Sequence, residues 1–445
     1  MFGGSTPWYA RRVSQPEGII LRNRRVRVRA FFVILASAAM LSACGGRPEG
    51  VLEPVALTAA GTSQVDMAVA TTRMRSDNRA VLFTGERGQA LDFANIVVSI
   101  PPASARKVGD VQWPKKLPGN PATDFVTVKA DDMTLPEAKA WFNNRIKKTP
   151  GRQALVFIHG FNNRFDDAVY RYAQIVHDSG APVVPILFTW PSRGSLLDYG
   201  YDRESTNYSR DALEKLLTAL AKDPNVDEVS VLAHSMGNWV TLEALRQMAI
   251  RNGRVLPKIK NVMLASPDVD VDVFRSQMAD IGSKGPQITL FVSQDDRALA
   301  ASRRIWGNVE RLGQIDPSKE PYLTELERDK ITVIDLTKLH TDDKLNHGKF
   351  AASPQVVQAI GARLAEGQAI TDSNVGLGDR IIAASTGAAA TVGAAAGLVV
   401  AAPVALVDPN TRKNFNGNVE ALGDQVSDTA TATGDAIQST TQVGR

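Results

Sequence analysis

The feature that most constrains the fold is a regular alternation of short apolar runs with amphipathic stretches between about residues 95 and 364. The runs are apolar on both faces, as in strands buried between two layers of helices, and the stretches repeat apolar residues at the i, i+3, i+4 and i+7 spacing of a helix. This alternation predicts an α/β fold with a mostly parallel central sheet and helices on both faces, whose ligand site lies at the carboxyl ends of the strands. The predicted strands are N-I-V-V-S-I, A-L-V-F-I-H, V-V-P-I-L-F-T-W, V-S-V-L-A-H, N-V-M-L-A-S, I-T-L-F-V-S and I-T-V-I-D-L.

One strand-to-helix junction carries a candidate nucleophile. The stretch A-H-S-M-G places Ser235 directly after the run V-S-V-L-A-H and before a helical stretch that starts at Trp239. A nucleophilic serine in such a sharp turn requires small residues two positions away on each side, and Ala233 and Gly237 stand there, with alanine where the usual pattern has glycine. The alternative is that Ser235 only caps the following helix.

A nucleophilic serine also needs a base and an acid, which in this arrangement follow it in the order Ser, acid, His. His347 lies in the loop after the last predicted strand and is the predicted base, with His340 as the fallback. A solvated surface histidine is the alternative for either residue.

The acid is expected after the seventh strand of the expected order, where Asp295 and Asp296 stand together. Asp296 is predicted because it lies further past the strand end and can hold the imidazole in the required tautomer. Asp268 and Asp270, after the preceding strand, are the reserve candidates. For Asp295 and Asp296 the alternative is that they only cap the following helix.

An oxyanion formed during acyl transfer needs two preorganised N–H donors. The amide of Met236, directly after the serine, is one predicted donor. The loop F-I-H-G-F-N-N-R after the third strand supplies the other, at Phe161. A strand-to-helix turn in which Gly160 provides backbone freedom is the alternative, and both interpretations can hold together.

The segment from Trp190 to Glu204 follows the fourth strand and carries aromatic and basic residues without helical periodicity. Two interpretations stay open: its side chains line an acyl or ring-shaped group and bind an anion, or they pack beneath the loop. The aromatic residues are Trp190, Tyr199 and Tyr201, and the basic ones are Arg193 and Arg203. The sequence contains no Cys/His metal cluster, Walker loop or dinucleotide fingerprint, so we expect neither a metal nor a cofactor.

The start of the chain has the pattern of an export signal. The basic stretch Arg22–Arg29 precedes the run A-F-F-V-I-L-A-S-A-A-M-L, which is too short to span a membrane comfortably. The run ends in L-S-A-C-G, which resembles the lipobox of bacterial lipoproteins, and this implies that Cys44, the only cysteine, is lipidated. We therefore expect a lipid-anchored protein of the cell envelope that faces the periplasm, with Gly45 favouring the outer membrane. A cytoplasmic chain with a basic start and a buried apolar helix is the alternative.

Charge argues against a nucleic-acid partner. The chain carries a net charge of +4, but residues 1–43 contain seven Arg and one Glu. The remainder therefore carries about −2 and has no basic patch to bind a phosphate backbone.

Several motifs together resemble a bacterial family of α/β hydrolases of unknown function, over about residues 152–364. The resemblance implies the α/β-hydrolase fold and supports Ser235, Asp296 and His347 as a catalytic triad, but it implies no substrate. We expect an exported, lipid-anchored serine hydrolase that cleaves a carboxylic ester or a related acyl bond. The alternative is a non-catalytic binding or scaffold lipoprotein of the cell envelope. The motifs are H-G-F-N, F-T-W-P-S-R-G, Y-D-R-E-S, A-H-S-M-G-N, S-P-D-V-D, D-R-A-L and the late histidine.

The domain organisation follows from composition. We predict a signal peptide at 1–43, followed by a lipidated tether and irregular lead-in at 44–90. The first 20 residues resemble no signal peptide and are interpreted as an over-extended gene start. The α/β-hydrolase domain follows at 91–366, and an Ala/Gly/Thr-rich tail at 367–445. Within the tail, 27 residues from Ile381 to Val407 carry no charged side chain. Their weak apolarity favours a segment lying against the envelope over a membrane span. The sequence gives no indication of an oligomeric state.

Overall fold

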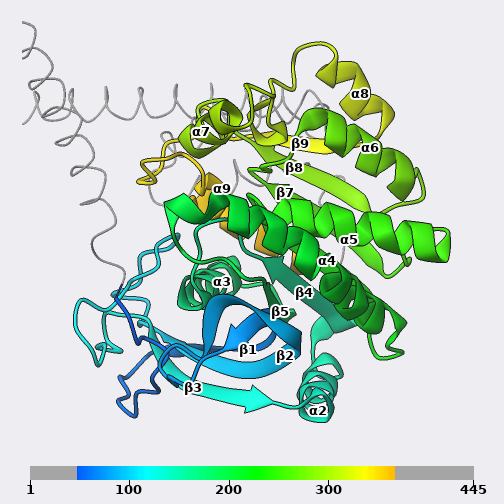
Figure 1. Ribbon diagram of the computed structural model, residues 1–445. Helices are drawn as coiled ribbons and strands as arrows, with labels where there is room; N and C mark the ends of the chain where they lie inside the picture. The colour runs from blue at the N-terminus through cyan, green and yellow to red at the C-terminus, as the bar shows by residue number, and fades with distance from the viewer. Residues whose placement is uncertain (1–47, 366–445) are drawn as a thin grey trace, which may run out of the picture. The chain divides into compact units, whose positions relative to one another are not determined.

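The structure is a computed structural model that describes residues 48–365, and these residues form one nine-stranded sheet covered by helices (Figure 1). The strand order is β3-β2-β1-β5-β4-β6-β7-β8-β9. Strands β4 to β9 run parallel, β1 pairs parallel with β5, and the pairs β1–β2 and β2–β3 are antiparallel. The prediction of a mostly parallel sheet in an α/β-hydrolase fold is confirmed. The strands are β1 Ser63–Arg75, β2 Phe83–Ile100, β3 Val126–Met133, β4 Gln153–Ile158, β5 Val184–Thr189, β6 Glu228–His234, β7 Ile259–Ala265, β8 Gln287–Val292 and β9 Thr332–Asp335.

The helices cover both faces of the sheet, and each face has its own apolar core. Side chains alternate across a strand, so in β4 the Val156 side chain packs in the core under α2, α4, α5 and α6, whereas Phe157 points to the other face and stacks on Tyr172 of α3. In Figure 1, α4, α5 and α6 lie side by side on one face. The helices are α2 Leu135–Ile146, α3 Phe165–Ser179, α4 Tyr199–Lys222, α5 Gly237–Asn252, α6 Val271–Ile281, α7 Arg297–Ile305, α8 Tyr322–Arg328, α9 Lys349–Ala352 and α10 Pro354–Ala365.

Local sequence signals account for several helix ends. Thr134 and Glu137 form a capping box at the start of α2. Asp270 caps α6 by accepting hydrogen bonds from the amides of Asp272 and Val273. Gly180 ends α3 in the left-handed conformation that glycine adopts without a steric penalty.

The strand order indicates where a ligand would bind. From β4 the chain crosses to β5 on one side, and from β6 onward it proceeds in the opposite direction. The strand order therefore reverses between β4 and β6. In open parallel sheets, ligands bind outside the carboxyl ends of the strands at such a switch point, which is where the loops after β4 and β6 lie.

The predicted irregular lead-in at 44–90, with the domain beginning at 91, is wrong. Strand β1 lies inside the sheet between β2 and β5, and β2 begins at Phe83. The strand pattern is obscured because the buried residues of β1 include Thr71 and Arg73, which find hydrogen-bond partners on β5 and its following loop. Strand β3 is the second strand that the prediction lacks. The loop of Phe161 follows β4 and the acidic pair follows β8, each one strand later than the expected order placed it.

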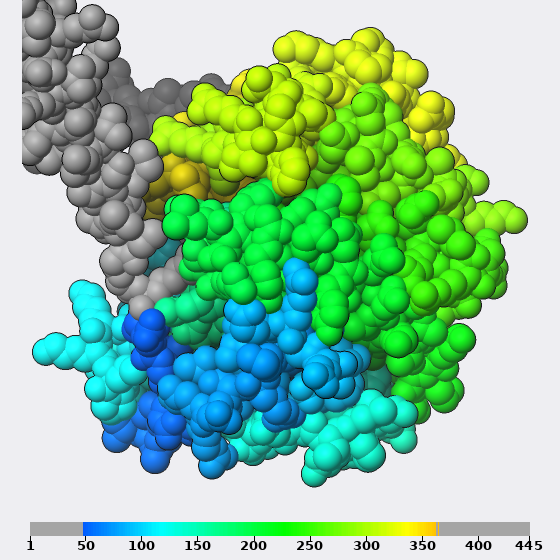
Figure 2. All heavy atoms as spheres, in the orientation of Figure 1, coloured from blue at the N-terminus to red at the C-terminus, as the bar shows by residue number. Residues whose placement is uncertain are grey.

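The early strands also contact the helical layer directly. Arg87 in β2 donates hydrogen bonds to the Ser205 hydroxyl (3.0 Å) and the Tyr201 carbonyl (3.2 Å) of α4. Figure 2 shows the blue spheres of this part of the chain lying against the green spheres of α4. Residues before 91 thus belong to the packed domain.

Candidate active site

Ser235 lies in a strained turn between β6 and α5. Its φ angle is +54°, a left-handed conformation that is costly for a residue with a Cβ and is typical of functional sites. The turn is held by hydrogen bonds from the Ser235 amide to the Ala265 carbonyl (2.9 Å) and from the Asp268 amide to the Ser235 carbonyl (3.3 Å). Ser235 does not act as the N-cap of α5, because the residue at that position is Met236.

Close approach of α5 to β4 explains the small residue after the serine. A Cβ on Gly237 would lie 2.3 Å from the His159 carbonyl oxygen, and a Cβ on Gly160 would lie 2.7 Å from the Ser235 Cβ. Both distances are far below van der Waals contact. Glycine at these positions lets the loop after β4 meet the serine turn.

His347 and Asp296 are directly hydrogen-bonded, with 2.7 Å between Nδ1 of the histidine and Oδ2 of the aspartate. The Asp296 side chain is fully buried, and its other oxygen accepts a hydrogen bond from the Leu299 amide (2.9 Å) and so caps α7. Capping and orientation of the histidine are therefore combined in one carboxylate. Burial acts to lower the pKa of His347, but the carboxylates of Asp296, Asp268 and Asp343, with Asp296 contributing most, together raise that pKa above its usual value.

The loop that carries His347 is fixed from two sides. The Asp343 carboxylate accepts hydrogen bonds from the amides of Gly348 (2.6 Å), His347 (2.7 Å) and Leu345 (3.0 Å). Burial acts to raise the pKa of Asp343, but these bonds, with the nearby His347, lower it. The His347 carbonyl lies 3.1 Å from His234 Nε2 and accepts a hydrogen bond from the Ser266 hydroxyl at 2.9 Å. The base is thus held beside the residue that precedes Ser235.

His234 is a positioning residue that the sequence analysis missed. Burial, followed by the neighbouring His347, lowers the pKa of His234 to about 3, so its ring is neutral. Because its Nε2 partner is a carbonyl oxygen, Nε2 must carry the proton and donate. Its position inside the serine motif, in A-H-S-M-G, was the available signal.

The competing acids and the fallback base are placed elsewhere. Asp295 accepts hydrogen bonds from Lys349 Nζ (2.8 Å) and from the amide of the Asn346 side chain (2.9 Å). Asp268 accepts from the hydroxyls of Tyr199 and Ser302, and Asp270 caps α6. His340 is exposed at the surface. Of the predicted acids and bases, the structure brings only Asp296 and His347 together.

The two predicted oxyanion donors border the same turn. Within residues 48–365, neither the Phe161 amide nor the Met236 amide has a hydrogen-bond acceptor. The Phe161 carbonyl, in contrast, accepts from the side-chain amide of Asn163 (2.8 Å), which holds the loop conformation. Free amides next to a strained serine are what oxyanion stabilisation requires.

The loop after β4 rests on a buried arginine that the sequence analysis did not identify. Arg73 in β1 is fully buried and donates to the carbonyls of Asn163 (2.8 Å) and Ser192 (2.8 Å) and to the Thr189 hydroxyl (2.8 Å). Burial lowers the pKa of Arg73 to about 10, against the raising effect of nearby carboxylates such as Asp202. The guanidinium therefore stays charged at neutral pH.

His159 connects this arginine to the start of the loop. Its Nδ1 lies 2.9 Å from the Gly160 carbonyl, and its Nε2 lies 3.2 Å from the Trp190 amide, which donates to it. Burial, with the Arg73 charge, holds the pKa of His159 well below its usual value. A neutral histidine with its proton on Nδ1 satisfies both contacts.

The segment from Trp190 to Glu204 divides between the two interpretations. Trp190 is fully buried and packs beneath the loop, with its indole donating to the His159 carbonyl (2.9 Å). Arg193 lies at the surface, where it pairs with Glu86 (2.9 Å), and the Tyr201 hydroxyl donates to the same carboxylate. The expected lack of helical periodicity is wrong from Tyr199 onward, where α4 begins.

Tyr199 and Arg203 face the candidate site instead. The Tyr199 ring packs edge-on against Phe161 at 4.9 Å between centroids, and its hydroxyl donates to Asp268 (2.7 Å). The Arg203 guanidinium lies over the Trp239 ring, 3.2 Å from its centre. These contacts join the start of α4 to the first turn of α5.

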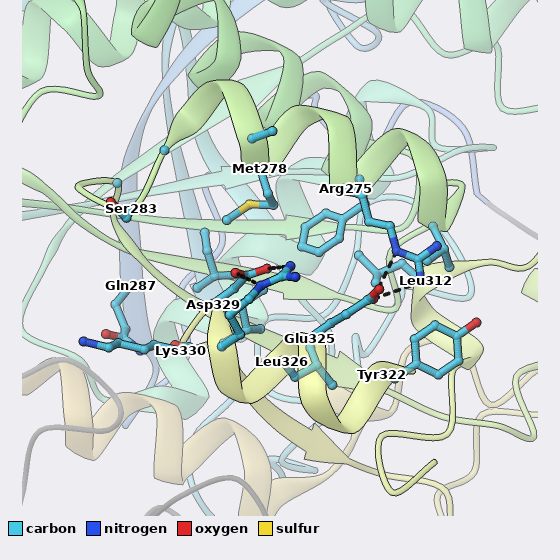
Figure 3. A pocket seen from close by; sticks show the side chains of 18 of the residues that line it. Arg275, Met278, Ser283, Gln287, Leu312, Tyr322, Glu325, Leu326, Asp329 and Lys330 are labelled. Atoms are coloured by element: carbon cyan, nitrogen blue, oxygen red, sulfur yellow. Dashed lines mark hydrogen bonds and ion pairs between the residues drawn. The ribbon is translucent and has the colours of Figure 1, made fainter. Parts of the chain in front are cut away.

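Two well-defined cavities lie away from Ser235. A cavity of about 460 Å³ is bordered by α6, α8 and the short turn Leu312–Gln314, and the ion pair between Arg275 and Glu325 (2.9 Å) lies at its side (Figure 3). An apolar cavity of about 670 Å³ lies among α2, α4 and the early strands. Neither is lined by Ser235, Asp296 or His347.

Two further properties concern the part of the chain that the structure describes. No group of three or more His, Cys, Asp or Glu side chains there is arranged to hold a metal ion. No helix between residues 48 and 365 combines the length and apolarity needed to cross a membrane. Cys44, the predicted signal peptide and the predicted tail lie outside the described residues.

Comparison with known proteins gives a family match over the region just described. The family model "Alpha/beta hydrolase of unknown function (DUF900)" matches residues 135–363. The uncharacterized protein alr1448 of Nostoc sp. is 26% identical over 133 residues, which cover 24% of this chain and 34% of that protein. The chain thus spans about a third of the length of this curated relative.

Solved structures of two hydrolases are also similar. One of two fungal esterases from Rhizomucor miehei matches 74% of this chain and 87% of its own, with 13% identity and a TM-score of 0.31. A putative cell surface hydrolase from Lactobacillus plantarum matches 48% of this chain and 92% of its own, with 10% identity and a TM-score of 0.28.

Proposed function

Because the chain belongs to this family of α/β hydrolases of unknown function, we propose that it is a serine hydrolase that cleaves a carboxylic ester or a related acyl bond through an acyl-enzyme on Ser235. The observation that carries the proposal is the 2.7 Å bond between His347 and a fully buried Asp296, beside a serine at φ +54°. A histidine oriented by a buried carboxylate, in contact with the residue that precedes a strained serine, supports acyl transfer by that serine.

The proposed reaction has two halves. The Ser235 hydroxyl attacks the substrate carbonyl while Nε2 of His347 takes its proton, and the amides of Phe161 and Met236 stabilise the oxyanion. The protonated His347 then gives its proton to the departing alcohol, which leaves the acyl group on the serine. Water attacks this ester by the same route, releases the acid and restores Ser235. Asp296 holds the His347 tautomer and stabilises the imidazolium throughout.

Labelling with a fluorophosphonate probe tests this function. We expect an adduct on the folded wild-type protein and none on Ser235→Ala, with His347→Ala labelled orders of magnitude more slowly. Absence of an adduct on the wild type, or persistence of the adduct in Ser235→Ala, would overturn the proposal and favour a non-catalytic binding or scaffold protein.

We further propose that the enzyme is exported and anchored by lipid on Cys44, in the cell envelope and facing the periplasm. The basic stretch, the short apolar run and the L-S-A-C-G sequence support this proposal. Two or more acyl chains on the mature N-terminus are enough for stable membrane attachment. The substrate is an ester or acyl compound that reaches this compartment.

A further inference from the structure

A charged cluster lies directly beside the proposed nucleophile and takes no part in the proposed mechanism. It contains Arg203 from α4, Arg311 before the turn Leu312–Gln314, and the buried carboxylate of Asp268. The Asp268 amide donates to the Ser235 carbonyl (3.3 Å), so the cluster is attached to the serine turn itself.

Arg203 reaches this place from the neighbouring helix. Its guanidinium stacks on Trp239, and the Trp239 amide donates to the carbonyl of Met236, the residue after the serine (3.1 Å). Tyr199, one helical turn before Arg203, contacts Phe161 of the candidate oxyanion loop. One turn of helix spans about 5.4 Å. These contacts join Arg203 to both sides of the serine turn, which places an anion bound by Arg203 on the side of an acyl group at Ser235.

The cluster has more positive than negative charge. The two oxygens of Asp268 accept hydrogen bonds from the hydroxyls of Ser302 and Tyr199, at 2.7 Å each, and Arg311 Nε lies 3.5 Å from one of them. Arg203 has no carboxylate partner within hydrogen-bonding distance among residues 48–365. Glu204, the next residue, is exposed.

Two buried nitrogen atoms in the cluster lack a hydrogen-bond partner among the described residues, namely Nη1 of Arg203 and Nε of Arg311. The Arg311 side chain is only 7% exposed. Buried cations that are incompletely paired are costly, and an unsatisfied buried group in a native protein requires an explanation, of which a bound anion is one. Arg193, which the sequence places in the same segment, shows the contrast, because Glu86 and Asp198 neutralise it.

We infer that Arg203, supported by Arg311, binds an anionic group of the substrate next to the acyl bond. A carboxylate or a phosphate fits, since the planar guanidinium donates two parallel hydrogen bonds to either group. The inference rests on the proposed serine hydrolase function and adds a substrate class to it: esters that carry a negative charge a few bonds from the scissile carbonyl.

Two chromogenic substrates that differ only in charge test the inference: 4-nitrophenyl hydrogen adipate and its neutral methyl ester. We expect the wild type to prefer the anion by about 10- to 100-fold in kcat/KM, the range for a hydrogen bond to a charged group. Arg203→Gln should abolish this preference, mainly through KM, and Arg203→Lys should keep part of it. Arg193→Gln is the matched control and should keep the full preference. Thermal unfolding checks that each variant is folded.

Two results would overturn the inference: equal kcat/KM values for the two substrates in the wild type, or an unchanged preference in folded Arg203→Gln. If fluorophosphonate still labels Ser235 in that case, the hydrolase function stands without the inference. Absence of both labelling and turnover overturns the function and the inference together. Inhibition of methyl-ester hydrolysis separates the two anions. Inorganic phosphate should inhibit the wild type more than Arg203→Gln if phosphate is the natural group, and free adipate should do so if it is a carboxylate.

Discussion

Replacement of Asp296 by Asn is the sharpest test of the proposed mechanism, because one atom changes and the fold has reason to persist. Asn retains the oxygen that accepts from the Leu299 amide at 2.9 Å, and Asn caps helices as well as Asp does. Its nitrogen, however, can only donate. His347 Nδ1 must then accept, so the ring proton moves to Nε2, the atom that has to take the proton from Ser235. We expect kcat to fall about 10⁴-fold.

The cost in stability should be modest and separable from the loss of rate. Asn at position 296 exchanges a hydrogen bond between the histidine and a buried carboxylate for one between two neutral groups, and the difference is about 1–1.5 kcal/mol. The assay is hydrolysis of 4-nitrophenyl butyrate at a pH where wild-type His347 is neutral, together with urea unfolding of the same samples.

The adjacent residue provides the reciprocal control. Asp295 pairs with Lys349, whose side chain is 2% exposed. Asp295→Asn removes the negative charge beside that ammonium but keeps one amide oxygen as an acceptor, in addition to the carbonyls of Leu336 and Thr337. Breaking a fully buried pair costs about 3–5 kcal/mol, but Asp295 is 42% exposed and screened by water, so about 1–2 kcal/mol is expected. Turnover should change only a few-fold. A crippled but stable Asp295→Asn, or an active Asp296→Asn, would refute the acid assignment.

Four further outcomes are expected. The kcat/KM profile should rise with pH around a midpoint above 6.5, because the carboxylates around His347, chiefly Asp296, outweigh burial and raise its pKa; a lower midpoint would contradict this. The raised pKa also stabilises the folded state fully at acidic pH, and this stabilisation is lost as the pH rises through the raised value. The stability gap between wild type and His347→Gln should therefore narrow toward alkaline pH. Gly237→Ala should cost about 1–3 kcal/mol and slow probe labelling, since its Cβ would lie 2.3 Å from a carbonyl oxygen, whereas Gly200→Ala, with nothing within 4 Å, should be neutral or stabilising. Cys44→Ser should release the protein from membrane fractions. If the variant and the wild type fractionate alike and the wild type carries no acyl label, the anchoring proposal is wrong. Removal of residues 375–445 should leave fluorophosphonate labelling of Ser235 intact.

The arrangement around the serine was predictable because its determinants are local or follow from chain order. Ala233 and Gly237 flank the serine within five residues, and the turn they permit is formed by that short stretch alone. The choice between Asp295 and Asp296 came from the position of the strand end, and the structure places Asp296, not Asp295, on His347. Chain order and strand ends suffice here, since parallel strands bring their carboxyl ends to one edge of the sheet.

Strand β1 was not predictable in the same way, because several of its buried residues are polar. The residues Thr71, Thr72 and Arg73 read as the end of any exposed segment, yet all three are buried. Their partners are residues more than 100 positions away, such as Thr189 and Ser209. A prediction that requires apolar residues at the buried positions of a strand fails where hydrogen bonds replace apolar contacts.

The same reasoning explains why the residues that hold the candidate oxyanion loop and the base could not be identified from the sequence. Arg73 holds the loop mainly through the carbonyl oxygens of Asn163 and Ser192, and His234 holds the base through the carbonyl of His347. Every residue has a carbonyl, so a backbone acceptor leaves no mark in the sequence. The motifs after β4 and β5 are thus linked physically by one arginine from a strand that precedes both. Arg73→Met removes the hydrogen-bond donors but keeps an unbranched side chain. This substitution should shift the Phe161 amide from its position beside the serine turn and leave the bond between Asp296 and His347 in place.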